Sequence, residues 1–150
     1  MDLVDVSDRV SVLSNTLVIV GEGIRSPRDL IGKRVALAEP SSVPAGIYAK
    51  HYLTTIGLWD AVAPNVVPTE NVRAALAAVG SGNVDAAIVY KTDAKNRFAF
   101  EVPREQGPRI SYPFAILKNA EHRDGARRFL AYLRSKPALD VFRKHGFLVQ

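Results

Sequence analysis

Three short apolar segments constrain the fold of this chain more than any other feature of its sequence. They comprise residues 17–20, 35–38 and 86–90, and each is bounded by glycine, proline or charged residues. Such runs are typical of strands covered on both faces, which are usually parallel. Between the second and third runs lie two helical patterns, which end at Gly57 and Gly80. This order predicts a layered α/β domain with parallel strands.

The residues on either side of this α/β region follow a different pattern. Residues 98–100 and 111–117 are expected to form strands. Asp124 is expected to cap a helix, which restarts at Pro137 and ends near Gly146. The α/β region is therefore bracketed by segments that need each other to fold.

This bracketing predicts two lobes joined by two hinge crossings. Residues 1–22 would be a remnant of the first lobe that leads into the hinge, and residues 23–93 would form the second lobe. Residues 94–150 would return to the first lobe and carry the C-terminal helices.

Composition excludes several classes of function. The chain has no cysteine, so disulfides and thiolate metal sites are ruled out. Its three histidines, His51, His122 and His145, lack the spacing of a metal site. No metal bound by side chains and no cofactor are expected. No catalytic acidic pair, Ser-His-Asp arrangement or phosphate-binding glycine loop is recognisable, so an enzyme is not expected either.

The charge pattern also limits the partners. The 20 Lys and Arg residues outnumber the 15 Asp and Glu residues, with a basic group near the C-terminus. These basic residues alternate with apolar ones at helical spacing, as on a helix with one solvated face. Nucleic acid is therefore not an expected partner. No apolar run approaches the roughly 20 residues needed to span a bilayer, and no signal peptide is visible, so direct membrane insertion is not expected.

Two predicted helix starts have chemistry that suits an anion. Pro44 fits the first position of a helix and leaves the amides of Ala45 and Gly46 without helical partners. Asn71 fits the cap of the next helix and leaves the amide of Val72 in the same state. Amides of this kind attract anions.

Tyr90 is the third candidate. It ends the third apolar run, at the carboxyl end of a strand, where ligands of open α/β sheets bind. Its phenol can donate a hydrogen bond without adding charge. Capped helices and core tyrosines are also common without any ligand, so these residues alone stop short of defining a site.

The segment around the first helix start resembles a known family. Residues 39–50, Glu-Pro-Ser-Ser-Val-Pro-Ala-Gly-Ile-Tyr-Ala-Lys, are similar to the strand–turn–helix signature of the periplasmic molybdate-binding proteins. The resemblance continues in order through residues 57–60, 70–76, 88–94, 111–113 and 142–147. It implies an α/β, type II periplasmic-binding-protein fold, with one complete lobe and the later part of the other.

The resemblance also implies a ligand and its donors. In this family the second lobe holds molybdate or tungstate through two backbone amides and one tyrosine hydroxyl, which correspond to Ala45, Val72 and Tyr90. Two serines of the first lobe complete the family's site, in an N-terminal segment that this chain does not contain. The serines at residues 7, 11 and 14 fall too late to be those two.

The expected function is that of a solute-binding protein for molybdate or tungstate, the receptor of an ABC importer, N-terminally truncated as given. Its partner would be the membrane permease, and its location periplasmic or extracytoplasmic. Two alternatives stay open. One is an oxyanion-sensing effector domain of a transcriptional regulator, because similar two-lobed folds occur there. The other is a truncated remnant that folds but no longer binds.

Overall fold

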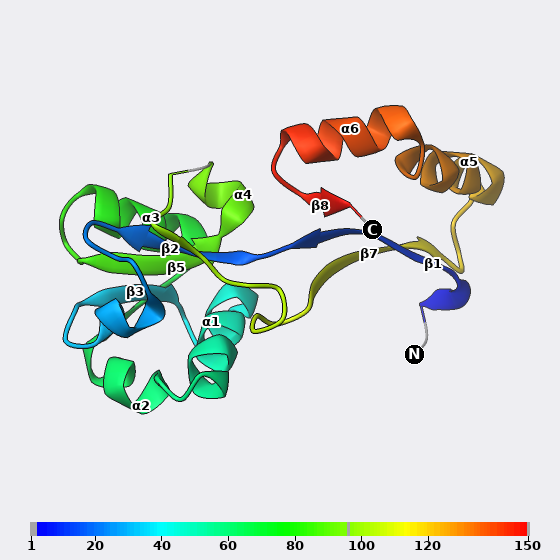
Figure 1. Cartoon of the computed structure of the whole chain (residues 1–150). Coiled ribbons are helices and arrows are strands. Elements are labelled where there is room, and N and C mark those ends of the chain that lie inside the picture. The colour runs from blue at the N-terminus through cyan, green and yellow to red at the C-terminus, as the bar shows by residue number, and fades with distance from the viewer. Residues whose placement is uncertain (1–2, 96, 150) are drawn as a thin grey trace. The chain divides into compact units, whose positions relative to one another are not determined.

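The computed structural model describes residues 3–95 and 97–149. Residues 1–2, 96 and 150, which belong to the expected segments 1–22 and 94–150, lie outside the described residues. The chain divides into two compact units (Figure 1). Unit 1 consists of Met1–Asn15 and Ile110–Gln150, and unit 2 consists of Thr16–Arg109. Unit 2 is therefore longer at both ends than the expected lobe of residues 23–93, because the strands next to those limits pair within its sheet.

Unit 2 is built on a five-stranded sheet with the order β4-β3-β5-β2-β6. The strands are β2 (Leu17–Gly21), β3 (Val35–Ala38), β4 (Val66–Thr69), β5 (Ala86–Tyr90) and β6 (Phe100–Glu101). As expected, β3 is parallel to β5, and it is also parallel to β4.

Strand β2 corrects one expectation, since it runs antiparallel to both β5 and β6. The run at residues 17–20 predicts a parallel strand because it is apolar throughout. Helices on both faces of a sheet bury a strand equally in either direction, so this pattern carries no information on direction.

Helices cover both faces of this sheet, with α1 and α2 on one face and α3 and α4 on the other (Figure 1). The helices are α1 (Pro44–Thr55), α2 (Trp59–Val62), α3 (Val72–Gly80) and α4 (Lys91–Ala94), with 3-10 turns at Pro27–Leu30 and Ala63–Asn65. Consecutive residues of β3 are consequently inaccessible to solvent: Val35, Ala36 and Leu37 are each 0% exposed. The layered α/β architecture is confirmed.

Unit 1 contains a three-stranded antiparallel sheet with the order β7-β1-β8. Its strands are β1 (Val4–Asn15), β7 (Ile110–Leu117) and β8 (Leu148–Val149). Helix α5 (Arg123–Leu133) packs against β7, and α6 (Lys136–Lys144) packs against β8. None of the described helices in either unit is both long and apolar enough to cross a membrane.

The expected start of the first C-terminal helix needs a small correction. Helix α5 begins at Arg123, with His122 as the capping residue and no side-chain cap bond. Asp124 lies inside the first turn and pairs with Arg127 at 3.6 Å instead. The expected strand at residues 98–100 is likewise displaced, because β6 comprises Phe100–Glu101.

Candidate oxyanion-binding site

The three predicted site residues lie at one edge of the unit 2 sheet. Strands β3, β4 and β5 are adjacent and parallel, so their carboxyl ends meet at the same edge. Ala45 is the second residue of the helix after β3, Val72 is the first residue of the helix after β4, and Tyr90 ends β5. Ala45 and Val72 belong to one buried cluster, and Tyr90 packs against it. The fold therefore brings all three residues into one neighbourhood.

The turn between β3 and α1 is held by its own hydrogen bonds. The Glu39 carboxylate accepts from the Ser41 amide at 3.2 Å and from the Ser41 hydroxyl at 2.8 Å. The Glu39 carbonyl accepts from the amide of Val43, the capping residue of α1, at 2.9 Å. These contacts fix the direction in which the chain enters the helix.

The first turn of α1 lies directly against the end of β3. A Cβ atom at Gly46 would be 1.9 Å from the Ala38 carbonyl oxygen, so only glycine fits this approach. The first bond of the helix runs from the Ile47 amide to the Val43 carbonyl at 3.0 Å. The amides of Ala45 and Gly46 precede that bond and are not part of the helical ladder.

The start of α3 is capped by a side chain. The Oδ1 atom of Asn71 accepts from the Ala74 amide at 3.0 Å, and the Asn71 carbonyl accepts from the Ala75 amide at 3.1 Å. The Val72 amide comes before both of these donors, so the cap leaves it outside the helical ladder. The Val72 side chain is 8% exposed, which anchors this residue in the core.

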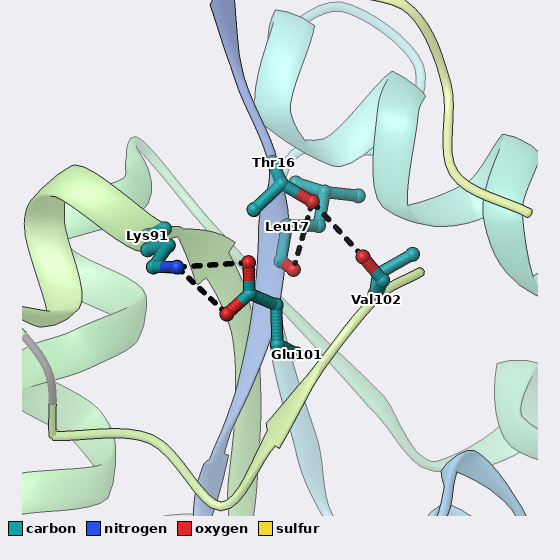
Figure 2. Close-up of polar contacts among 5 residues, drawn as sticks. All are labelled: Thr16, Leu17, Lys91, Glu101 and Val102. Carbon is teal, nitrogen blue, oxygen red and sulfur yellow. Dashed lines mark hydrogen bonds and ion pairs between the residues drawn. The ribbon is translucent and has the colours of Figure 1, made fainter. Parts of the chain in front are cut away.

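Tyr90 lies next to a group of contacts that joins three strands. It pairs with Leu17 of β2, and the following residue, Lys91, donates its amide to the Thr16 carbonyl at 3.0 Å. The Lys91 ammonium donates to both carboxylate oxygens of Glu101 at 2.7 and 2.8 Å (Figure 2). Since β2 lies between β5 and β6, this ion pair bridges across β2.

Thr16 adds a second connection between β2 and the segment that follows β6. Its hydroxyl donates to the Val102 carbonyl at 3.1 Å, and Figure 2 shows this bond beside the Lys91–Glu101 pair. The Val102 amide donates in turn to the Leu17 carbonyl at 3.0 Å. Both contacts lie at the end of the sheet where β5 finishes, and together they tie β2 to the segment after β6 beside Tyr90.

One titratable group close to these residues has a perturbed pKa. Partial burial raises the pKa of the Asp93 carboxyl above its ordinary value, while the positive charge of Arg73 acts in the opposite direction. Arg73 follows Val72 in α3, and Asp93 lies in α4, which follows Tyr90. The candidate donors themselves are uncharged amides and a phenol.

A prominent depression on unit 2 lies elsewhere. It has a volume of about 870 Å³ and lies at the opposite edge of the sheet, around the end of β2 and the start of β5. The residues that line it include Glu22, Lys33, Asp85 and Arg97, and none of the three predicted site residues. We assign the candidate site by its donors rather than by the size of the hollow, because a small anion needs few contacts.

Sequence reasoning missed several residues that shape this neighbourhood. The Thr69 hydroxyl donates to the carbonyls of Leu37 in β3 and of Asn71, the residue that caps α3. Lys91 and Glu101 form the ion pair beside Tyr90. A threonine shortly before a capping asparagine is a weak local signal for the first of these. The ion pair has no signal in the sequence, because its partners meet only when β2 pairs with both neighbours.

A family model for bacterial extracellular solute-binding proteins matches residues 2–148, and the chain belongs to this family. Its relatives include the molybdate-binding protein ModA of Escherichia coli, which is 31% identical over an alignment of 163 positions that covers 98% of this chain and 63% of the relative. A protein of Bacillus subtilis, provisionally described as the ABC transporter substrate-binding lipoprotein YvgL, is 43% identical over 122 residues, which are 79% of this chain and 47% of that protein.

A solved structure supports the fold. The substrate-binding domain of a provisionally described molybdenum ABC transporter from Clostridium difficile superposes with a TM-score of 0.85 at 28% identity, covering 97% of this chain and 68% of that one. The chain thus spans about half to two thirds of the lengths of the relatives described here. The type II periplasmic-binding-protein fold is confirmed. Membership of a solute-binding family agrees with a binding protein rather than an enzyme, and it favours the receptor over the regulator alternative.

Proposed function

We propose that this chain carries part of the oxyanion site of an ABC importer's receptor, and that its ligand is molybdate or tungstate. The observation that supports this best is the meeting of two helix starts and Tyr90 at one sheet edge. The Ala45 and Val72 amides and the Tyr90 hydroxyl would donate to the oxygens of the anion. The permease of the importer would be the partner, at an extracytoplasmic location.

The chemistry of the donors fits a doubly charged oxyanion. Burying such an ion is costly unless its oxygens are hydrogen-bonded, and a buried cation would add its own desolvation penalty. Neutral amides and a phenol satisfy the oxygens without that second cost. The amides at two helix starts also contribute the favourable end of each helix dipole.

The three donors alone should give weak binding. Each hydrogen bond to a charged acceptor contributes roughly 1.5–3 kcal/mol, so three contribute roughly 5–9 kcal/mol before the costs of association. Subtracting an association cost of at least about 4 kcal/mol leaves about 5 kcal/mol at most, so the dissociation constant should be near millimolar at the tightest. The names of the relatives support the identity of the anion, since the protein from E. coli is named for molybdate binding and the C. difficile domain for molybdenum transport.

Titration of the isotope-labelled chain, followed by the NMR resonances of its amides, tests the proposal. Molybdate and tungstate should shift the Ala45 and Val72 amide resonances with a common midpoint, and the smaller sulfate should do so at higher concentration. If none of the three anions shifts these resonances, the proposal fails, and the chain has the fold without the binding.

A proline at the start of α3 isolates one donor. Val72 is the first residue of the helix, where proline is tolerated, and Asn71 before it is extended with φ −160° and ψ 171°, as a residue before proline prefers. Val72→Pro should therefore keep the helix but remove the amide, weakening molybdate binding by roughly 10- to 100-fold. Val72→Ala, which loses side-chain volume but keeps the amide, is the control and should bind within a few-fold of wild type.

Tyr90→Phe tests the hydroxyl. The variant keeps the ring that packs against the core, so folding should be nearly unchanged. Molybdate binding should weaken by roughly 1.5–3 kcal/mol if the hydroxyl donates to the anion. Unchanged affinity would remove Tyr90 from the donor set without affecting the two amides.

A further inference from the structure

Thr69, the last residue of β4, contacts both the turn before α1 and the residue that caps α3. We infer that its hydroxyl is a positioning group that fixes the Val72 amide relative to the Ala45 amide and thereby sets the affinity for the anion. The inference rests on the proposed function of those two amides. It concerns a residue that would not itself touch the anion.

Strand β4 needs such support because it is poorly held. It is an edge strand of the five-stranded sheet and pairs with β3 alone. The Thr69 carbonyl faces β3, so the nitrogen of Pro68, which precedes it, faces away from β3 and its lack of a hydrogen costs no bond between the two strands. The four residues of β4 are therefore held from one side only, and the last of them leads into the start of α3.

Thr69 adds side-chain connections to this one-sided pairing. Its carbonyl accepts from the Glu39 amide at 2.9 Å. Its hydroxyl lies 3.1 Å from the Leu37 carbonyl and 3.0 Å from the Asn71 carbonyl, and its single proton is shared between these two acceptors. Thr69 thereby links β3, the turn before α1 and the capping residue of α3.

The two amides of the candidate site depend on Thr69 unequally. The first turn of α1 is fixed against β3 by the close approach of Gly46 to the Ala38 carbonyl, without any contribution from Thr69. The start of α3 follows the edge strand and is tied to β3 by the Thr69 contacts. Hydrogen bonds weaken steeply with misalignment, so a small shift of the start of α3 would cost the Val72 donor and leave Ala45 in place.

Thr69→Val tests this dependence, because valine keeps the shape of threonine and removes only the hydroxyl. In a molybdate titration of the labelled 150-residue chain, we expect the midpoint to rise about five- to tenfold. The shift of the Val72 amide at saturation should shrink, whereas that of Ala45 persists. A merely structural role would weaken both responses equally. Thr69→Ser, which restores the hydroxyl, should return the midpoint to within about twofold of wild type.

Thr54→Val is the matched control. Its hydroxyl also donates to a backbone carbonyl, that of Lys50 at 2.8 Å, but near the end of α1, and its removal should leave the titration unchanged. Thr69→Ala replaces Thr69→Val if the valine variant does not fold. The positioning role would be overturned if Thr69→Val showed the midpoint and the amide shifts of the wild type. It would also be overturned if a folded Thr69→Ser bound molybdate no better than Thr69→Val. A wild-type chain that shows no shift would instead refute the proposed function itself.

Discussion

The two units differ in how completely their own residues bury their sheets. In unit 2, helices lie on both faces of the sheet, and the side chains on both faces of β3 are inaccessible to solvent. In unit 1, β7 alternates: Ile110 and Ile116 are buried, whereas Ser111 and Leu117 are exposed. Its helices also leave large apolar side chains on the surface, with Phe129 61% exposed. The difference indicates that unit 2 forms a self-sufficient core and that stability is uneven along the chain.

The largest expected contrast comes from truncating one apolar side chain in each unit. Leu37 is 0% exposed, so Leu37→Ala should cost about 2–5 kcal/mol, because it removes buried surface and leaves a cavity. Phe129→Ala should change stability by no more than about 0.5 kcal/mol, since the ring is already exposed. Urea unfolding monitored by Trp59 fluorescence reports on unit 2, and hydrogen exchange of the α5 amides reports on unit 1. Equal losses from the two substitutions would refute the contrast.

A second contrast uses two glycines that each occupy the third position of a helix. Gly46→Ala in α1 places a methyl group against the Ala38 carbonyl and should cost at least about 1–3 kcal/mol through forced displacement. Gly125→Ala in α5 places it 3.9 Å from the nearest atom, in the His122 side chain, and should stabilise by about 0.5–1 kcal/mol. Thermal unfolding of both variants checks the signs. A tolerated alanine at residue 46 would mean that α1 does not lie as close to β3 as described.

A third, smaller contrast concerns two tyrosine hydroxyls. The Tyr52 hydroxyl is buried and has no hydrogen-bond partner within the described part of the chain, and burial raises the pKa of Tyr52. Tyr52→Phe should therefore be neutral or stabilise unit 2 by up to about 1 kcal/mol. The Tyr112 hydroxyl in unit 1 accepts from the Asn15 side chain at 3.1 Å, so Tyr112→Phe should cost about 1 kcal/mol. Denaturant midpoints would show opposite shifts, and a destabilised Tyr52→Phe would indicate a bound water at that hydroxyl.

The smallest expected contrast is in the pH dependence of the two units. Burial raises the folded-state pKa of Asp93 above its ordinary value of 3.8. Ionised Asp93 therefore destabilises the folded state, and this cost disappears as pH falls through the raised pKa. In unit 1, hydrogen bonds from Lys136 and Arg143 lower the pKa of Asp140, so its contribution is lost as pH falls. Asp93→Asn and Asp140→Asn should change the slope of stability against pH in opposite directions. Slopes of the same sign would contradict this assignment.

Much of unit 2 could be predicted from the sequence because its signals are local. Asn71 and Pro44 mark helix starts by their own chemistry, and the buried runs mark β3 and β5. The direction of β2 could not be predicted, because a fully apolar run is buried equally well in either direction. Strand β4 was not foreseen, since it contains Pro68 and exposed residues, as an edge strand can.

The candidate site shows the same division. The sequence places Tyr90 at the carboxyl end of a strand, but it groups Ala45, Val72 and Tyr90 only through the family resemblance, since it does not predict β4, the strand before Val72. It could not supply the contact of Gly46 with Ala38 or the bonds of Thr69, because these depend on the distance between neighbouring strands. Local patterns indicate which amides lack helical partners, whereas tertiary packing decides which contacts hold them in place.

The insertion of unit 2 between the two parts of unit 1 has a consequence for the order of folding. Strand β1 pairs with β7, so Asn15 meets Ile110 only after the whole of unit 2 has been made. On a ribosome, β1 emerges long before its partner, while unit 2 has all its strands within one continuous stretch of chain. Closing a long loop is entropically costly, and a folded unit 2 shortens that loop by holding its ends at fixed positions. Unit 2 should therefore fold first during synthesis, which shortens the effective loop between β1 and β7 and so favours the completion of unit 1.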